Sequence, residues 1–390
     1  MRKATSPPPT ARAEHVGSVT PPRRHSIPLA TGHLEIEVSR SDLPFEDLCG
    51  FAARRNPRRG FLFISRVLGR HLPVRPSVMR GAQTRLASRI PVDLPGPVVV
   101  LGLAETAIAL AQGVHQVWTR LSGRKDVLFL HTTRYRLDAP LAFVFEEEHS
   151  HASRHLVYAP TDPADAALFR AAQSLVIVDD EASTGGTFVN LAQAFTSSPC
   201  RGTALQRIVC VTLTDWSPPF VARMPAETVV VSLLEGAYQF TPNDEARVVA
   251  MPHATGNDEL KDLFIQRNRG RLGLRSSPGW AGALPAVAPG DRVLVLGTGE
   301  FTWLPFCLAE RLEAAGVDVR CQSTTRSPIR LGHDVASCVA FPDNYDDGIP
   351  NFLYNYTPGQ ADRVFLCHET PSARMPPQIA ESLGAIPLEM

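Results

Sequence analysis

The sequence predicts an α/β protein of two domains, each with a parallel sheet flanked by helices. Its 390 residues exceed the length of one ordinary domain, and 44% of them are hydrophobic, which is enough for two cores. Short apolar runs alternate with segments of helical spacing, and this rhythm returns after residue 291. Because parallel strands need crossover connections, such alternation favours parallel sheets.

Composition sets the domain boundaries. Residues 1–32 are expected to form a disordered tail, because six prolines among the first thirty residues oppose a helix and no apolar signal-peptide core is present. An arginine-rich organellar transit peptide is the alternative. Residues 33–242 are then the first domain, residues 243–290 a connector with a helical patch at 260–267, and residues 291–390 the second domain.

Charge and cysteine usage exclude several classes of protein. Lysine plus arginine equals aspartate plus glutamate at 39 each, so no overall basic surface for nucleic acid is expected. The seven cysteines are odd in number and form no C-x-x-C pair, which favours reduced thiols in the cytoplasm over disulfides or a zinc ribbon. The longest apolar run, 98–114, is interrupted by Glu105, so no membrane span is expected.

The first domain shows the strand and helix signals most clearly. Four-residue apolar runs are typical of strands buried on both faces of a parallel sheet. Apolar side chains at helical spacing predict helices at 107–121, which Gly123 ends, and at 188–195. The predicted strands are residues 98–101, 127–130, 175–178, 208–213 and 228–233.

The second domain repeats parts of the first. VVVLGLAE at 98–105 is similar to VLVLGTGE at 293–300, and the tripeptide TTR follows the next predicted strand in both domains. VIVDDE at 176–181 is similar to VFLCHE at 364–369. We therefore expect a diverged copy of the first domain, in which two acids became Cys367 and His368. A methyltransferase-type glycine turn at 297–299 is a weaker alternative.

The stretch LVIVDDEASTGGT, residues 175–187, carries the strongest functional signal. Ligands bind at the carboxyl ends of strands in open α/β sheets, and Asp179 and Asp180 end this strand. Two adjacent acceptors match the neighbouring hydroxyls of a ribose. The following loop combines two glycines, which free backbone amides for an anion, with hydroxyl donors and a helix start. Its residues are Ala182, Ser183, Thr184, Gly185, Gly186 and Thr187.

This stretch resembles the phosphoribosyl-pyrophosphate signature of the type I phosphoribosyltransferases. The resemblance implies displacement of pyrophosphate from an activated ribose, with Mg²⁺ held mainly by the substrate, and often a homodimer. It also implies a pyrophosphate loop, often with a cis peptide, after the first core strand. That loop comprises Gly102, Leu103, Ala104, Glu105 and Thr106, with Arg134 and Arg136 as candidate partners of pyrophosphate oxygens. A plain strand-to-helix turn and a solvated arginine pair are the structural alternatives.

Two further segments complete the expected site. The resemblance implies a mobile lid at 138–155, in which Glu147 and His149 are candidate acid–base groups. A solvated loop is the alternative, and a metal site at its histidines is a weaker one. Trp216, after a later strand, is a candidate for the base pocket, although an ordinary core tryptophan has the same signature.

The run Thr325-Arg326-Ser327-Pro328 resembles the TRSP domain that follows a phosphoribosyltransferase domain in a bacterial family. That family is associated with tellurium-resistance-type gene clusters and with nucleoside-like biosynthesis or stress responses. The expected function is therefore transfer of phosphoribose from phosphoribosyl pyrophosphate to a small, base-like acceptor that the motifs do not identify. The rival interpretation is a non-catalytic regulator that binds the same sugar phosphate or a nucleotide.

Overall fold

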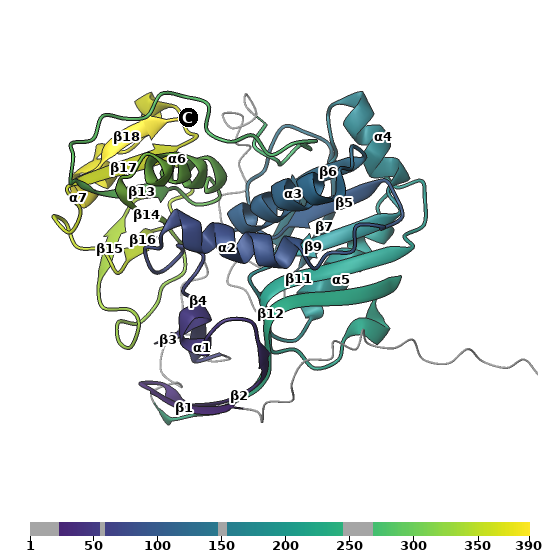
Figure 1. The fold of residues 1–390 in the computed structure, drawn as a ribbon, viewed down its shortest axis with the longest axis horizontal. Helices are drawn as coiled ribbons and strands as arrows, with labels where there is room; N and C mark the ends of the chain where they lie inside the picture. The colour runs from purple at the N-terminus through teal and green to yellow at the C-terminus, as the bar shows by residue number, and fades with distance from the viewer. Residues whose placement is uncertain (1–22, 55–58, 147–153, 245–267) are drawn as a thin grey trace, which may run out of the picture.

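The computed structural model describes residues 23–54, 59–146, 154–244 and 268–390, which form two α/β units side by side (Figure 1). The predicted fold class is confirmed, because the central strands of both units run parallel and carry helices. The predicted helical patch at 260–267 lies outside the described residues. Among the described helices, none combines the length and apolar character that crossing a bilayer requires.

The first unit is built on one large sheet, and its strands follow the predicted apolar runs. Five parallel strands, β5, β6, β9, β11 and β12, form its centre, with short β10 also beside β11. In spatial order the sheet contains β1 (Arg23–Leu29), β2 (Gly32–Ser41), β12 (Glu227–Pro242), β11 (Arg207–Asp215), β9 (Ser174–Val178), β5 (Val98–Gly102) and β6 (Val127–His131), and β10 is Glu181–Ala182.

Helices and hairpins surround this sheet. Gly123 ends α3 in the left-handed conformation (φ 65°), as its position predicts. The helices are α1 (Phe45–Leu48), α2 (Pro76–Ala87), α3 (Ile108–Ser122), α4 (Pro163–Ala171) and α5 (Gly186–Thr196), with a 3₁₀ turn at Val221–Arg223. Antiparallel hairpins join β3 (Cys49–Ala53) to β4 (Phe61–Ser65) and β7 (Leu141–Glu146) to β8 (Arg154–Tyr158).

The predicted extent of the tail is wrong, and part of the predicted connector packs on the first domain. The tail does not extend to residue 32, because β1 pairs with β2 from Arg23 to Leu29 and extends the sheet. Pro28 fits there because an edge strand tolerates a missing amide donor. Part of the predicted connector pairs with a strand of the first domain. Phe129 and Leu274 exchange backbone hydrogen bonds of 2.8 and 2.9 Å, so residues near 274 cover the outer edge of β6.

The second unit has the strand order that a copy of the first would have. Its order β14-β13-β17-β18 corresponds to β6-β5-β9-β11, with every pairing parallel, and the hairpin β15–β16 corresponds to β7–β8. The elements are β13 (Arg292–Gly297), α6 (Trp303–Ala314), β14 (Asp318–Ser323), β15 (Cys338–Phe341), β16 (Asn351–Tyr354), β17 (Arg363–His368), α7 (Pro377–Leu383) and β18 (Ile386–Glu389), with a 3₁₀ turn at Ser372–Arg374.

Hydrogen bonds repeat along with the strands. The Thr132 hydroxyl accepts a bond from the loop after β5 (2.8 Å), and the Thr324 hydroxyl accepts one from the loop after β13 (3.0 Å). Each hairpin also carries a buried tyrosine, Tyr158 or Tyr354. Its hydroxyl accepts a hydrogen bond from a backbone N–H and donates one to a backbone carbonyl, both in the segment after β6 or after β14. These local details support duplication beyond the shared topology.

Strand register corrects one equivalence expected from the sequence. The last residues of β5 and β9 are partners, and so are Gly297 and Cys367 at the ends of the equivalent strands β13 and β17. The positions equivalent to the twin aspartates of the first domain are therefore His368 and Glu369. The prediction of Cys367 and His368 was wrong by one residue, because similarity of short apolar runs does not fix register.

The two units share one continuous core. Buried side chains from α3 and β5 belong to the same apolar cluster as those from α6 and β13. Helix α2 lies between α3 and α6 (Figure 1). There Arg80 forms a two-pronged contact with Glu310, at 2.8 and 2.6 Å. This packing brings the second unit against the carboxyl ends of the strands in the first.

Candidate functional site

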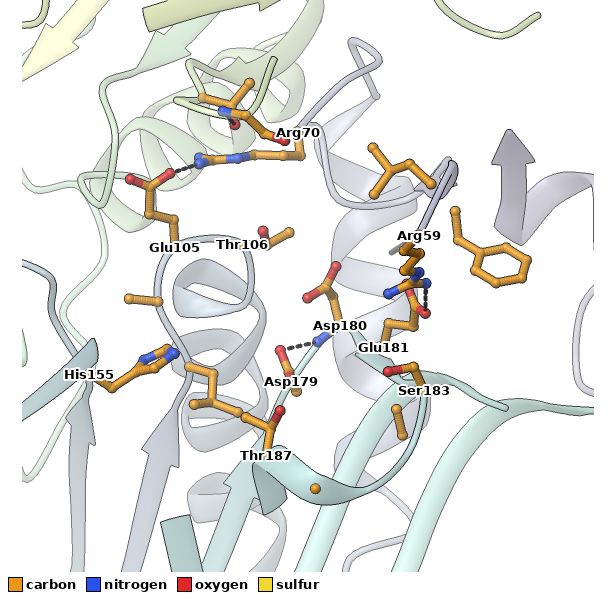
Figure 2. A pocket seen from close by; sticks show the side chains of 18 of the residues that line it. Arg59, Arg70, Glu105, Thr106, His155, Asp179, Asp180, Glu181, Ser183 and Thr187 are labelled. Carbon is orange, nitrogen blue, oxygen red and sulfur yellow. Dashed lines mark hydrogen bonds and ion pairs between the residues drawn. The ribbon is translucent and has the colours of Figure 1, made fainter. Parts of the chain in front are cut away.

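A cavity of about 260 Å³ opens at the carboxyl ends of β5 and β9 (Figure 2). Most of its walls come from the loops after these strands, the segment around hairpin β3–β4, and residues 325–327 of the second unit. Arg134, His155 and Ile349 complete the lining. Its position follows the rule that open α/β sheets bind ligands where strands end. The cavity is therefore the candidate active site.

The twin aspartates stand at the centre of this cavity. All five residues of β9 are buried, so the strand fixes the backbone of Asp179 and Asp180 directly behind it. The Asp179 Oδ1 atom accepts a 2.9 Å hydrogen bond from the Asp180 amide. Both side chains lie between the surrounding loops in Figure 2 and line the cavity. Two carboxylates are thus presented side by side, as hydroxyl-binding acceptors require.

The small-residue loop wraps one end of the cavity. Gly185 has a left-handed backbone (φ 72°), and a Cβ there would lie 2.3 Å from the Phe220 ring, so glycine is required. The Thr184 hydroxyl accepts a 3.2 Å hydrogen bond from the Gly186 amide. Helix α5 begins at Gly186, and residues through Thr187 line the cavity. The positive end of an 11-residue helix therefore faces the cavity.

The loop after β5 forms the opposite end. A Cβ on Gly102 would lie 2.5 Å from the Ala111 Cβ, so glycine lets α3 approach the strand. The Ala104–Glu105 peptide is cis, as the resemblance implies. The Glu105 carboxylate accepts hydrogen bonds from two arginine side chains, that of Arg70 and, at 2.7 Å, that of Arg326.

The guanidinium groups around Glu105 have a stronger effect on the pKa of its carboxyl than burial has. Burial would raise the pKa of this carboxyl, but Arg326, Arg70 and Arg134 outweigh burial and hold the pKa below its ordinary value. The pKa of Arg326 is raised in return, because the nearby carboxylate more than offsets burial. These guanidinium groups therefore keep Glu105 ionised at neutral pH.

The wall formed by the β3–β4 segment adds a second ion pair and an aromatic surface. Arg59 bonds Glu181 (Figure 2), and although burial lowers its pKa, the Glu181 charge raises it above the ordinary value. Phe63 lines the cavity and stacks on Trp216, with ring centroids 4.6 Å apart. This wall offers a flat apolar face beside a charged pair.

Most of the predicted site residues line the cavity. They are Leu103, Ala104, Glu105, Thr106, Arg134, Asp179, Asp180, Ala182, Ser183, Thr184, Gly185, Gly186 and Thr187. Gly102 lies behind them as the last residue of β5.

Two other predicted residues are placed elsewhere. Arg136 is exposed, because neighbouring side chains point in opposite directions here and those of Tyr135 and Leu137 are buried. Trp216 is buried behind Phe63 and supports the wall without reaching the cavity.

The expected lid contains hairpin β7–β8. Its tip, with Glu147 and His149, lies outside the described residues. His155, near the start of β8, lines the cavity (Figure 2), stacks on Phe145 at 4.6 Å and bonds the Thr132 hydroxyl at 2.9 Å. This histidine is a packed part of the cavity wall, whereas the other histidines of the metal alternative, His149 and His151, lie outside the described residues.

Sequence reasoning missed the cavity residues that come from distant segments. Arg70, Arg59 and Phe63 lie in the stretch 56–74, which precedes the first core strand and is part of the family resemblance, but the sequence assigned them no role in the site. Arg326 was part of a recognised motif, and its TTR repeat placed it at a strand end, but its contact across the domain interface required the folded chain. These residues are brought together by tertiary structure alone.

Comparison with protein families gives two matches. Residues 48–237 match a family described as phosphoribosyl transferase, and residues 274–382 match the TRSP domain found C-terminal to it. No curated protein matches the chain significantly.

Solved structures give partial likenesses. Adenine phosphoribosyl transferase from Trypanosoma brucei is 14% identical over 48% of this chain and 77% of its own, with a TM-score of 0.31. Hypoxanthine phosphoribosyltransferases from Trypanosoma cruzi and Staphylococcus aureus are each 14% identical over 43% of this chain. They are covered over 81% and 79% of their lengths, with TM-scores of 0.27 and 0.25. Scores this low do not bear on the function of the chain.

Proposed function

We propose that this chain, which matches the phosphoribosyl transferase family and the TRSP domain C-terminal to it, transfers phosphoribose from phosphoribosyl pyrophosphate to a small acceptor. One observation carries the proposal. Asp179 and Asp180, the loop 182–187 at the start of α5 and the loop 102–106 all border one cavity. These three elements match a sugar diol, a terminal phosphate and a pyrophosphate group in turn.

Each element has a distinct task in this proposal. The twin aspartates accept hydrogen bonds from the ribose 2- and 3-hydroxyls. Backbone amides of Gly185 to Thr187 and the hydroxyls of Thr184 and Thr187 donate to the 5-phosphate. The backbone of residues 103–106 and Arg134 bind the pyrophosphate.

The reaction breaks the bond between the anomeric carbon and pyrophosphate oxygen. Pyrophosphate leaves with the electron pair, while an acceptor nitrogen forms the new bond and loses its proton. Because positive charge develops on the sugar ring, fixed carboxylates beneath it and cations at the leaving group lower the barrier. Glu147 and His149 stay candidates for accepting the proton.

The donor set of the cavity also suits magnesium. Mg²⁺ prefers oxygen ligands, and the carboxylates of Asp179 and Asp180 supply such oxygens at the centre of this cavity. Within the described residues, no cluster of three or more His, Cys, Asp or Glu side chains is arranged as a metal site. We therefore propose that substrate oxygens supply most ligands, with Asp179 and Asp180 holding the ion or its waters. When bound, the ion neutralises charge on the leaving pyrophosphate.

The acceptor is expected to stack on the aromatic wall. Phe63 presents a buried ring to the cavity, and Arg59 with Glu181 offers hydrogen-bonding groups beside it. This combination suits a planar heterocycle with polar edges.

Release of pyrophosphate tests the proposal. The purified chain is mixed with phosphoribosyl pyrophosphate, Mg²⁺ and a panel of nucleobases and small heterocyclic acids, and pyrophosphate is measured by a coupled enzyme assay. We expect acceptor-dependent release. Binding of the sugar pyrophosphate by calorimetry with no release for any acceptor would favour the regulator, and no binding at millimolar concentration would refute the proposal.

A further inference from the structure

The second domain reaches into the cavity through the segment after β14. Thr325, Arg326 and Ser327 line the cavity together with the loop 102–106. The backbone of Thr325 exchanges hydrogen bonds of 3.0 and 2.7 Å with Phe352, which belongs to strand β16. Arg326 is therefore presented from a backbone that the sheet and hairpin of the second domain hold in place.

Arg326 meets an arginine of the first domain at a single carboxylate. Its Nε atom donates to Glu105 Oε1 at 2.7 Å, and Arg70 donates to the other oxygen of the same carboxylate. The Arg326 side chain is 13% exposed and that of Arg70 only 4%. Figure 2 shows Arg70 and Glu105 together at the end of the cavity beyond Thr106. One carboxylate thus orients two guanidinium groups beside the loop after β5.

Guanidinium groups are concentrated at this end of the cavity. Those of Arg70, Arg134 and Arg326 all act on Glu105. Asp347, whose oxygen lies 3.5 Å from Arg326, and Glu300 also act on Arg326. Several arginine donors beside a poorly hydrated loop suit the oxygens of a phosphate group, because charge-assisted hydrogen bonds are strong there.

The contact is reciprocal between the domains. Glu300, which occupies the position of Glu105 in the second domain, accepts a 2.6 Å bond from the Thr133 hydroxyl and a 2.7 Å bond from the Arg134 amide. Each domain therefore directs a glutamate at the TTR segment of the other. The arrangement is an integral part of the interface, and it fixes the position of Arg326 relative to the first domain.

We propose that Arg326 of the TRSP domain, together with Arg70, binds the pyrophosphate group of the sugar substrate, so that the second domain completes the active site of the first. This inference rests on the proposed function. The planar guanidinium donates from its Nε atom to Glu105, and its Nη1 atom lies 3.5 Å from Asp347. We assign the Nη2 atom to phosphate oxygens, a fixed geometry that lysine does not reproduce. Ribose 5-phosphate lacks that group and would not touch Arg326.

Two ligands that differ by the pyrophosphate group test this assignment. Binding of phosphoribosyl pyrophosphate and of ribose 5-phosphate is measured by calorimetry with Mg²⁺ for the full chain and for Arg326→Met and Arg326→Lys. Arg320→Met is the matched control, because Arg320 lies in the same domain, is 38% exposed and pairs with Asp318 outside the cavity. Thermal unfolding of each variant reports folding.

The expected result is selective. Arg326→Met weakens phosphoribosyl pyrophosphate binding by about tenfold or more and leaves ribose 5-phosphate binding unchanged, because lost hydrogen bonds to a charged group are of this size. Arg326→Lys gives an intermediate loss, and Arg320→Met gives none. Unchanged affinity for the pyrophosphate in Arg326→Met, or an equal loss for both ligands, would overturn the assignment. Failure of the unaltered chain to bind either ligand would instead refute the proposed function on which it rests.

Discussion

Equivalent strands of the two domains end at cavities of very different size. In the first, the loops after β5 and β9 enclose a cavity of about 260 Å³. In the second, the equivalent loops after β13 and β17 border a cavity of about 20 Å³, which Arg271 also lines. A shared strand order therefore did not preserve a shared site. The difference lies in which groups meet the acidic side chains at the strand ends.

In the second domain those acids meet Arg271, which comes from the segment that precedes the domain. Arg271 bonds Glu300 at 3.0 Å and Glu369 at 2.7 Å, and all three side chains are at most 4% exposed. Burial would lower the pKa of Arg271, but the two carboxylates raise it well above its ordinary value. Glu369 stands where the first domain has Asp180. The comparison suggests that one copy retained a ligand site, while in the other a buried arginine occupies the space at the equivalent strand ends.

The largest effect that this comparison predicts is on stability. Arg271→Met leaves two buried carboxylates without their cation, so we expect the free energy of unfolding to fall by about 3–5 kcal/mol. Urea denaturation of the full chain measures the loss. Adding Glu300→Gln and Glu369→Gln to the same variant removes the stranded charges and should restore most of it. A loss below about 1 kcal/mol would mean that Arg271 does not hold the second site together.

The next largest effect is on the rate of pyrophosphate release, which should depend on the strand end of the first domain and not on the equivalent strand end of the second. Asp180→Asn removes a charged acceptor from the proposed diol site, so we expect pyrophosphate release to slow roughly tenfold to hundredfold, equivalent to about 1.5–3 kcal/mol. Glu369→Gln changes the equivalent position of the second domain and is the matched control. It should reduce stability but leave the rate per folded molecule within about twofold.

Steady-state kinetics with the best acceptor, corrected for the folded fraction, measures both variants. An equal fall in rate would show that the second site also contributes to turnover. An unchanged rate in Asp180→Asn would remove this residue from the active site.

Local sequence patterns predicted the parts of the fold that local forces decide. Uninterrupted apolar runs predicted the central parallel strands, because burial on both faces demands them. The loop 182–187 was predicted as one unit, since glycines, hydroxyls and a helix start lie together in sequence. Its backbone has the left-handed glycine that such a turn needs. The tail was overextended because prolines mask an edge strand.

Contacts between distant segments could not be predicted in the same way. Arg70 and Glu105 are 35 positions apart, and Arg326 follows Glu105 by 221. Their meeting depends on how the two sheets pack, which no short window records. The one-residue error at Glu369 has the same origin, because pairing between β13 and β17 sets the register.

The smallest effect concerns acid sensitivity at one equivalent pair of positions, His131 in β6 and Ser323 in β14. Burial, with help from Arg271, lowers the pKa of His131 to about 3. The unfolded chain binds this proton below about pH 6.5 whereas the folded chain does not, so stability falls as pH drops below that value. His131→Asn should therefore reduce the loss of unfolding free energy between pH 6.5 and 5.5 by about 1 kcal/mol. Urea titrations at both pH values measure it, and an unchanged difference would mean that His131 is already protonated in the folded protein.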